Sequence, residues 1–249
     1  TRVPFNGPYD QKRVFVFVLD GYGMVQHLWG LRSSEQYINR SFSMDIFSWL
    51  EGRQEYNGKN ILGSTLATDT GSGLAAIFTG SISCVNGVLG SKMWNPTSHR
   101  VVDVLKEGPY QATGRVFKSF FDSLPDNIKI KVFHGGGRGE VPTPFGRLTY
   151  GGRSDYFGVN IAERIFALLL KSVEVENDSV RHLYCIYHPL IDRTGHSVGS
   201  FSNFELNEIK RFKSGLLAFL IDLAYYNEEV FDGKTTFLFT ADHGMFETS

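Results

Sequence analysis

The stretch Arg13-Val-Phe-Val-Phe-Val-Leu-Asp20 decides the fold of this chain. Its apolar residues are consecutive rather than alternating, and a loop that begins with Asp20-Gly21 follows them. Such a run predicts a strand buried on both faces, which is typical of parallel sheets covered by helices. Three further segments outward along the chain are expected to be strands, at residues 128–133, 182–188 and 235–240.

Between these strands the apolar residues recur with helical spacing. We expect helices in four segments, at residues 33–52, 70–80, 159–173 and 204–226. Polar or glycine-containing stretches predict loops at residues 51–59, 134–137 and 192–196. Strands that alternate with helices predict an α/β fold with a mostly parallel central sheet and helices on both faces. No linker interrupts this pattern, so residues 1–249 are expected to form a single domain.

The composition excludes several classes of protein. The 249 residues carry 25 basic and 26 acidic side chains, a balance that does not favour a nucleic-acid-coating protein. Apolar residues make up 42% of the chain without any run of about 18, so we expect a globular protein with no membrane span in this sequence. The cysteines, Cys84 and Cys185, are too few for a disulfide-rich miniprotein or a four-cysteine zinc site. Whether they pair with each other stays open.

Acidic and histidine residues lie at the carboxyl ends of the predicted strands, where ligands bind in open α/β sheets. Asp20 ends the first strand, Asp192 and His196 follow the third, and Asp242-His243 end the last. Each alone has a simpler interpretation, as a helix cap, a solvated loop or a strand cap. Carboxylate oxygens and imidazole nitrogens together suit zinc, and so many of them at one edge indicate two metal ions around a hydroxyl nucleophile.

Thr70 is the candidate hydroxyl, because it lies where a loop enters a helix and Gly71 follows it. Free backbone N–H groups and the helix dipole favour an anion such as phosphate at that place. The competing interpretation is an ordinary threonine that caps the helix.

Five motifs taken together resemble the alkaline phosphatase superfamily, and most closely its type I phosphodiesterase/nucleotide pyrophosphatase branch. They are Val18-Leu-Asp-Gly21, the segment from Thr68 to Gly80, Asn86-Gly-Val-Leu-Gly-Ser-Lys-Met-Trp-Asn-Pro96, the segment from Tyr187 to Gly199, and Thr240-Ala-Asp-His-Gly-Met245. The motifs occur in the family's order and at similar spacing across nearly the whole chain. The resemblance therefore implies an alkaline phosphatase-like fold.

The same resemblance implies a reaction and the residues that perform it. Thr70 would be the nucleophile of a metal-dependent phosphodiesterase or nucleotide pyrophosphatase, which transfers a phosphoryl group in line through a phospho-threonine. Two zinc ions, or other divalent metals, would be held, one by Asp20, Thr70, Asp242 and His243 and the other by Asp192 and His196. Gly71 and Ser91 would bind the phosphoryl oxygens. The substrate would be a phosphate diester or a nucleotide, and the location extracellular or extracytoplasmic.

Two departures from the family pattern leave alternatives open. The second zinc normally has one more histidine ligand downstream of the Asp-His-Gly-Met motif, so we expect the C-terminal part of the domain to be missing from this sequence. Within the chain, His134 and His188 are the local substitutes. Ser91 stands where many nucleotide pyrophosphatases have asparagine. An inactive or binding-only relative therefore stays an alternative, as does a phosphotransferase or phosphonate hydrolase of the same superfamily.

Overall fold

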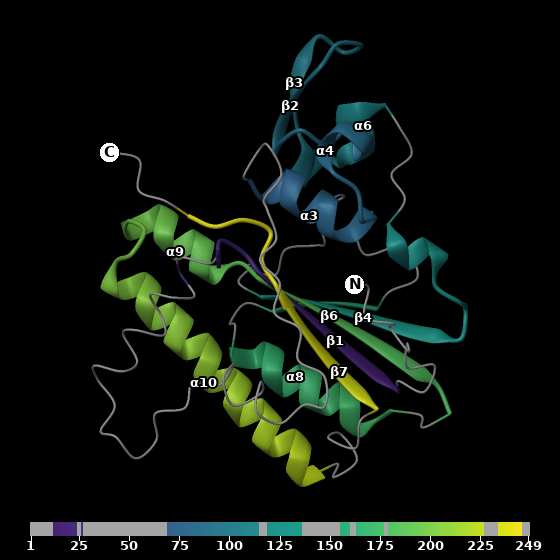
Figure 1. The fold of residues 1–249 in the computed structure, drawn as a ribbon, viewed down its shortest axis with the longest axis vertical. Coiled ribbons are helices and arrows are strands. Elements are labelled where there is room, and N and C mark those ends of the chain that lie inside the picture. The colour runs from purple at the N-terminus through teal and green to yellow at the C-terminus, as the bar shows by residue number, and fades with distance from the viewer. Residues whose placement is uncertain are drawn as a thin grey trace, which may run out of the picture.

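The computed structural model of the protein describes residues 12–23, 26, 69–114, 119–135, 155–159, 163–176, 179–226 and 234–245. At its centre lies a five-stranded sheet in which all neighbouring strands are parallel (Figure 1). The spatial order of the strands is β5 (Asp155–Val159), β4 (Ile128–Gly135), β6 (Arg181–His188), β1 (Arg13–Leu19) and β7 (Thr235–Thr240).

Helices and a small antiparallel hairpin make up the other elements of the described chain. In chain order they are α3 (Thr70–Thr79), α4 (Ser83–Asn86), the hairpin strands β2 (Lys92–Asn95) and β3 (Arg100–Asp103), α5 (Val104–Glu107), α6 (Pro109–Thr113), the 3-10 helix η1 (Phe120–Ser123), α8 (Glu163–Glu174), α9 (Leu190–Val198) and α10 (Asn203–Tyr226). None of the helices in these ranges has both the length and the hydrophobicity needed to cross a bilayer.

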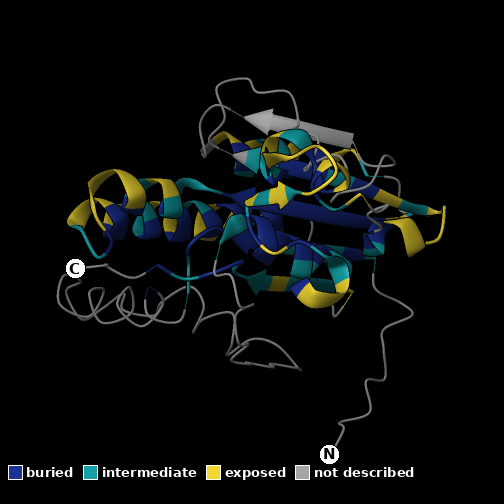
Figure 2. Ribbon diagram, turned by 90° about the horizontal axis from the view of Figure 1, so that it is seen from above, coloured by how far each residue is buried: buried dark blue, intermediate teal, exposed yellow. Residues whose placement is uncertain are grey.

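Strand β1 is buried on both faces because its successive side chains enter two different cores. Phe15 and Phe17 belong to the core shared with α8 and α10, and Phe15 stacks on Tyr184 of β6 with 4.8 Å between ring centroids. Val16 and Val18 pack into the opposite core, which α3 covers. Helices accordingly lie on both sides of the sheet in Figure 1, and Figure 2 shows the central sheet largely buried between them.

The predicted fold class, the parallel sheet and the helices on both faces are confirmed. The predicted strand at 128–133 continues to Gly135, so the loop predicted at 134–137 begins too early. The helix predicted at 159–173 is described as Glu163–Glu174, and Val159, its first predicted residue, belongs to β5 instead. The expected helix at 33–52 and the loop at 51–59 lie outside the described residues. Neither Cys84, which is exposed, nor Cys185, which is buried, forms a disulfide.

The loop predicted at 192–196 is wrong, because these residues lie inside α9. Ile191 is fully buried and anchors the helix. Gly195, which suggested a loop, is instead a packing position: a Cβ added there would lie 2.6 Å from the Sδ of Met245. The glycine therefore lets α9 lie close to the segment that follows β7.

Candidate metal centre and nucleophile

The candidate site lies at the carboxyl edge of three adjacent strands, β6, β1 and β7. Asp20 directly follows β1, Asp192 lies in the first turn of α9 after β6, and Asp242 and His243 follow β7. The N–H of Asp192 donates to the carbonyl oxygen of Asp20 at 3.2 Å. The strand order therefore brings together four predicted ligands that are widely separated in the sequence.

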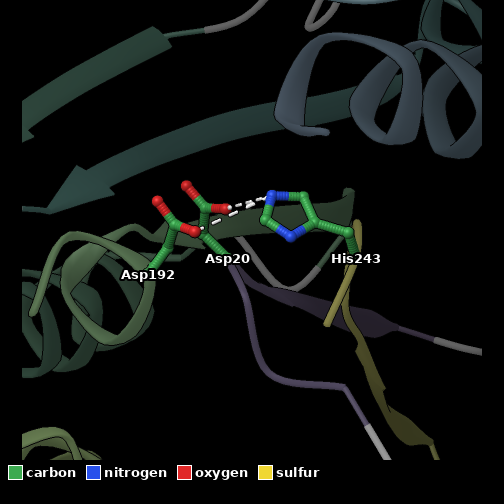
Figure 3. Close-up of side chains that lie close together, drawn as sticks. All are labelled: Asp20, Asp192 and His243. Atoms are coloured by element: carbon green, nitrogen blue, oxygen red, sulfur yellow. Dashed lines mark ion pairs between the residues drawn. The ribbon is translucent and has the colours of Figure 1, made fainter. Parts of the chain in front are cut away.

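Two carboxylates and one imidazole form the centre of this cluster (Figure 3). Single ligand atoms of Asp20, Asp192 and His243 all lie within 4.8 Å of one another. The Nε2 of His243 is 3.3 Å from Asp20 Oδ1, 3.9 Å from Asp192 Oδ1 and 3.7 Å from Asp242 Oδ2. Carboxylate oxygens with an imidazole nitrogen form a donor set that zinc accepts.

Thr70 is the first residue of α3, and its hydroxyl lies against this cluster. The Oγ1 of Thr70 is 3.2 Å from His243 Nε2 and donates to Asp20 Oδ1 at 3.4 Å. Glycine allows this approach, because a Cβ added at Gly73 would lie 2.4 Å from the carbonyl oxygen of Asp242. The helix that carries the predicted nucleophile is thus packed directly on the segment that carries two predicted ligands.

The electrostatics of the cluster favour a bound cation. Burial, and next the charge of Asp20, raise the pKa of Asp192 to about 6. The same two causes raise the pKa of Asp242. In addition, Asp192 Oδ1 and Asp242 Oδ2 are buried and accept no hydrogen bond. A divalent metal ion would neutralise these carboxylates and occupy their unbonded oxygens, so the residues fit a metal site.

His243 is oriented for the same role. Burial by itself lowers its pKa, but the hydrogen bond to Asp20 and the charge of Asp242 outweigh burial and raise the pKa to about 9. Its Nδ1 lies 3.1 Å from the carbonyl oxygen of Gly244, so Nδ1 donates there and Nε2 faces the carboxylates. Fixing one ring nitrogen in this way leaves the other available to a metal.

His196 lies at the border of the cluster. One helical turn separates it from Asp192 on α9, and its Nε2 is 3.4 Å from Asp192 Oδ1. Its side chain is 72% exposed, in contrast to 6% for His243. The structure therefore places the predicted second pair on one helix face, with the imidazole open to solvent.

The two substitute histidines occupy other places. His134 stacks on the ring of Tyr187 with 5.1 Å between centroids. His188 is buried, and its ring lies 5.0 Å from that of Phe212. Neither belongs to the group formed by Asp20, Asp192 and His243 among the residues that the structure describes.

Ser91 and Gly71, the predicted substrate-binding residues, contact each other beside Thr70. The N–H of Gly71 donates to the Oγ of Ser91 at 2.9 Å. This contact was not foreseen, because it joins the start of α3 to a loop 20 residues further along the chain. The backbone N–H that would bind a phosphoryl oxygen is thus bonded to the serine hydroxyl.

Two polar residues of the site have roles that sequence reasoning missed. The hydroxyl of Tyr187 in β6 donates to Asp20 Oδ2. Asp69 accepts hydrogen bonds from Ser72 and from the N–H of Ser91. A tyrosine one residue before the end of a predicted strand was the signal for the first, and an aspartate one residue before a helix was the signal for the second.

Comparison with known proteins identifies the fold. No protein-family model matches the chain, and no curated protein matches its sequence significantly. The solved structure of murine ectonucleotide pyrophosphatase/phosphodiesterase 5, an inactive variant in complex with AMP, matches with a TM-score of 0.59 and 17% identity over 96% of this chain. Another structure of the same murine protein matches with a TM-score of 0.58 and 16% identity over 95% of the chain.

The chain spans 59% of the length of the first of these structures and 58% of the second. The resemblance found in the sequence is thereby confirmed at the level of the fold: the chain has the alkaline phosphatase-like α/β fold of the nucleotide pyrophosphatase/phosphodiesterases.

Proposed function

We propose that this protein is a metal-dependent phosphodiesterase of the nucleotide pyrophosphatase type, with Thr70 as its nucleophile. One observation carries the proposal: the hydroxyl of Thr70 lies 3.2 Å from His243 Nε2 and 3.4 Å from Asp20 Oδ1, at the start of a ten-residue helix. A hydroxyl, a set of metal-binding groups and a helix N-terminus are the parts that phosphoryl transfer requires.

The residues that would hold the metals follow from the cluster. We assign Asp20, Thr70, Asp242 and His243 to one ion, and Asp192 and His196 to the other. When bound, zinc or a similar divalent cation would act as a Lewis acid on the phosphoryl oxygens and lower the pKa of a coordinated hydroxyl or water.

The chain's own residues would then orient and carry the transfer. Asp20 accepts the hydrogen bond that directs the Thr70 hydroxyl. In the first step Thr70 Oγ1 gives up its proton by way of Asp20 and bonds to phosphorus, while the bond to the leaving oxygen breaks and that oxygen takes up the proton. In the second, water attacks the same phosphorus from the side opposite Thr70, the bond between Thr70 Oγ1 and phosphorus breaks, and a proton of the water returns to Thr70. The N-terminus of α3 favours the negative charge of the phosphoryl group throughout.

A phosphate diester or nucleotide is the proposed substrate. Murine ectonucleotide pyrophosphatase/phosphodiesterase 5, whose fold this chain shares, was solved with AMP. Its name also describes an ecto-enzyme, and we extend an extracellular location to this chain as part of the proposal.

A binding-only protein is the second candidate, and the exposure of His196 favours it. A ligand histidine that is 72% exposed leaves the second metal weakly enclosed. A protein with one stable metal would bind a phosphate ester without turning it over efficiently.

Substitution of the nucleophile separates the two candidates. We expect Thr70→Ala to abolish hydrolysis of bis(4-nitrophenyl) phosphate while leaving the thermal unfolding temperature within a few degrees of that of the wild type. AMP binding, measured by calorimetry on the zinc-loaded protein, should persist in the variant. Full hydrolysis by Thr70→Ala would refute the mechanism, and a wild type that binds AMP without hydrolysing the diester would favour the binding-only alternative.

A further inference from the structure

Asp69 joins the helix of the proposed nucleophile to the loop that carries Ser91. As the N-cap of α3, its Oδ1 accepts from the N–H of Ser72 at 3.0 Å and from the hydroxyl of Ser72 at 2.9 Å. Its Oδ2 accepts from the N–H of Ser91 at 2.6 Å. One carboxylate therefore holds both the first turn of α3, through Ser72, and the loop that contains Ser91.

This arrangement decides how the hydroxyl of Ser91 can act. A serine hydroxyl has one proton to donate and two lone pairs that accept. The N–H of Gly71 already donates to Ser91 Oγ at 2.9 Å, and the main chain of Ser91 is held on both sides by Asp69 and by the N–H of Val104, which donates to the Ser91 carbonyl at 2.8 Å. Among the residues that the structure describes, none accepts the proton of the Ser91 hydroxyl, so this proton is available to a ligand.

The negative charge of Asp69 lies close to the helix N-terminus that would bind a phosphoryl group. A carboxylate beside a phosphate-binding helix N-terminus opposes the binding of an anion by Coulomb repulsion. Here both oxygens of Asp69 accept hydrogen bonds from the protein, which disperse its charge into N–H and O–H groups. Its geometric function therefore outweighs its unfavourable charge.

We propose that Asp69 is a positioning residue that holds Ser91 so that its hydroxyl donates to the phosphoryl group transferred to Thr70. Asp69 does not itself touch the substrate. It acts through Ser91, whose Oγ it places beside Gly71 and hence beside the nucleophile. The inference rests on the proposed function. It explains how the short side chain of Ser91 could bind a phosphoryl oxygen at a position where many nucleotide pyrophosphatases have the longer side chain of asparagine.

A double-mutant cycle tests this role. The variants are Asp69→Asn, Ser91→Ala and the two combined, with Asp122→Asn as the matched control. Asparagine still caps a helix, but its amide has only one oxygen that accepts hydrogen bonds. It can therefore accept from Ser72 or from the N–H of Ser91, whereas the carboxylate uses one oxygen for each. Asp122 likewise accepts from a backbone N–H, that of Ser119 at 2.8 Å, in the separate capping box of η1.

Two measurements on the zinc-loaded protein report on the cycle: kcat/KM for bis(4-nitrophenyl) phosphate and the inhibition constant of orthovanadate. We expect each single variant at the site to weaken both by about 10- to 100-fold, as for the loss of one hydrogen bond to a charged group. The double variant should be no worse than Ser91→Ala alone by more than about threefold, and Asp122→Asn should leave both measurements unchanged.

The outcomes distinguish this inference from the proposed function. Equal and additive losses from Asp69→Asn in both Ser91 backgrounds would show that Asp69 merely stabilises the helix, and would overturn the inference while the function stands. A wild-type protein that neither hydrolyses the diester nor binds vanadate would overturn the proposed function and this inference with it.

Discussion

The hydroxyl of Tyr187 orients the carboxylate of Asp20 in the candidate site. It donates from β6 to Asp20 Oδ2 and so leaves Asp20 Oδ1 directed at Thr70 and His243. Such a partner fixes the orientation of a metal-binding carboxylate without touching the metal.

We expect Tyr187→Phe to weaken zinc binding by about 10- to 100-fold, because the carboxylate of Asp20 loses its orienting donor. Competition with a chromophoric zinc chelator measures this change. Tyr184→Phe, on the same strand, is the matched control: its hydroxyl bonds Glu176 in the core, so this variant should lose stability and keep its zinc affinity. Equal zinc affinity in Tyr187→Phe and the wild type would contradict the assigned role.

Individual residues of the site were predictable where the residue type and a position at the end of a strand together indicated a metal ligand. Asp20, Asp192, Asp242 and His243 were found because carboxylates and imidazoles after apolar strands are unusual. The partners Tyr187 and Asp69 were not, because their roles depend on contacts between segments that only the folded chain brings together. The burial that separates His243 from His196 also depends on packing, which residue spacing does not encode.

At the scale of elements, the junction of α9 and α10 follows the helix that carries Asp192. Phe201, in the turn between these helices, has a φ of 62°, which is unfavourable for a residue with a side chain. Its N–H donates to Oε2 of Glu205 at 2.5 Å, and Glu205 is fully buried in the first turn of α10. The carboxylate therefore holds a strained turn in place.

We expect Glu205→Ala to lower the free energy of unfolding by about 2–4 kcal/mol, from the lost hydrogen bond and the cavity that remains. Urea denaturation measures the change. Arg211→Ala, on the same helix, removes an exposed side chain that pairs with Glu208 at 2.8 Å and should change the free energy by less than about 0.5 kcal/mol. Similar losses in both variants would contradict the role of Glu205 in the turn.

Elements were predictable where the hydrophobic pattern had one interpretation. The long apolar run of β1 admitted little but a buried strand, β6 and β7 were found from shorter apolar runs, and α10 was found from its repeated apolar spacing. The segment 192–196 was taken for a loop because glycine and polar residues suggest one, whereas the burial of Ile191 and Gly195 against neighbouring segments makes it helical. The strand β5 and the hairpin of β2 and β3 are short and gave no comparable signal.

For the whole molecule, the unneutralised cluster makes stability depend on pH in the absence of metal. The pKa of Asp192 is raised to about 6, and that of Asp242 is also raised. Each carboxyl therefore contributes fully to the free energy of unfolding at low pH, and this contribution is lost as the pH rises through its pKa in the folded protein. The raised pKa of His243 adds a contribution that is lost as the pH rises through about 9. All three act in the same direction.

We therefore expect the unfolding temperature of chelator-treated protein to fall as the pH is raised from 5 toward 9. Zinc should reverse this trend, because protons compete with zinc for the same side chains. The difference in unfolding temperature between zinc-loaded and chelator-treated protein should therefore grow as the pH rises. Differential scanning fluorimetry at pH 5, 7 and 8.5 tests this, with magnesium as a control ion that carboxylate–imidazole sites bind poorly. A difference that shrinks with rising pH would contradict the cluster as a metal site.

The neighbouring positions of β1 and β7 have a consequence for biosynthesis. These are the first and the last described strands, and the bond from Gly21 N–H to Asp242 Oδ1 joins residues 221 positions apart. A nascent chain that has emerged only as far as β6 would present Asp20 without Asp242 and His243. Pairings so distant in sequence form late. An ion held jointly by Asp20, Asp242 and His243 would therefore report that synthesis had passed β7 and that β7 had paired with β1.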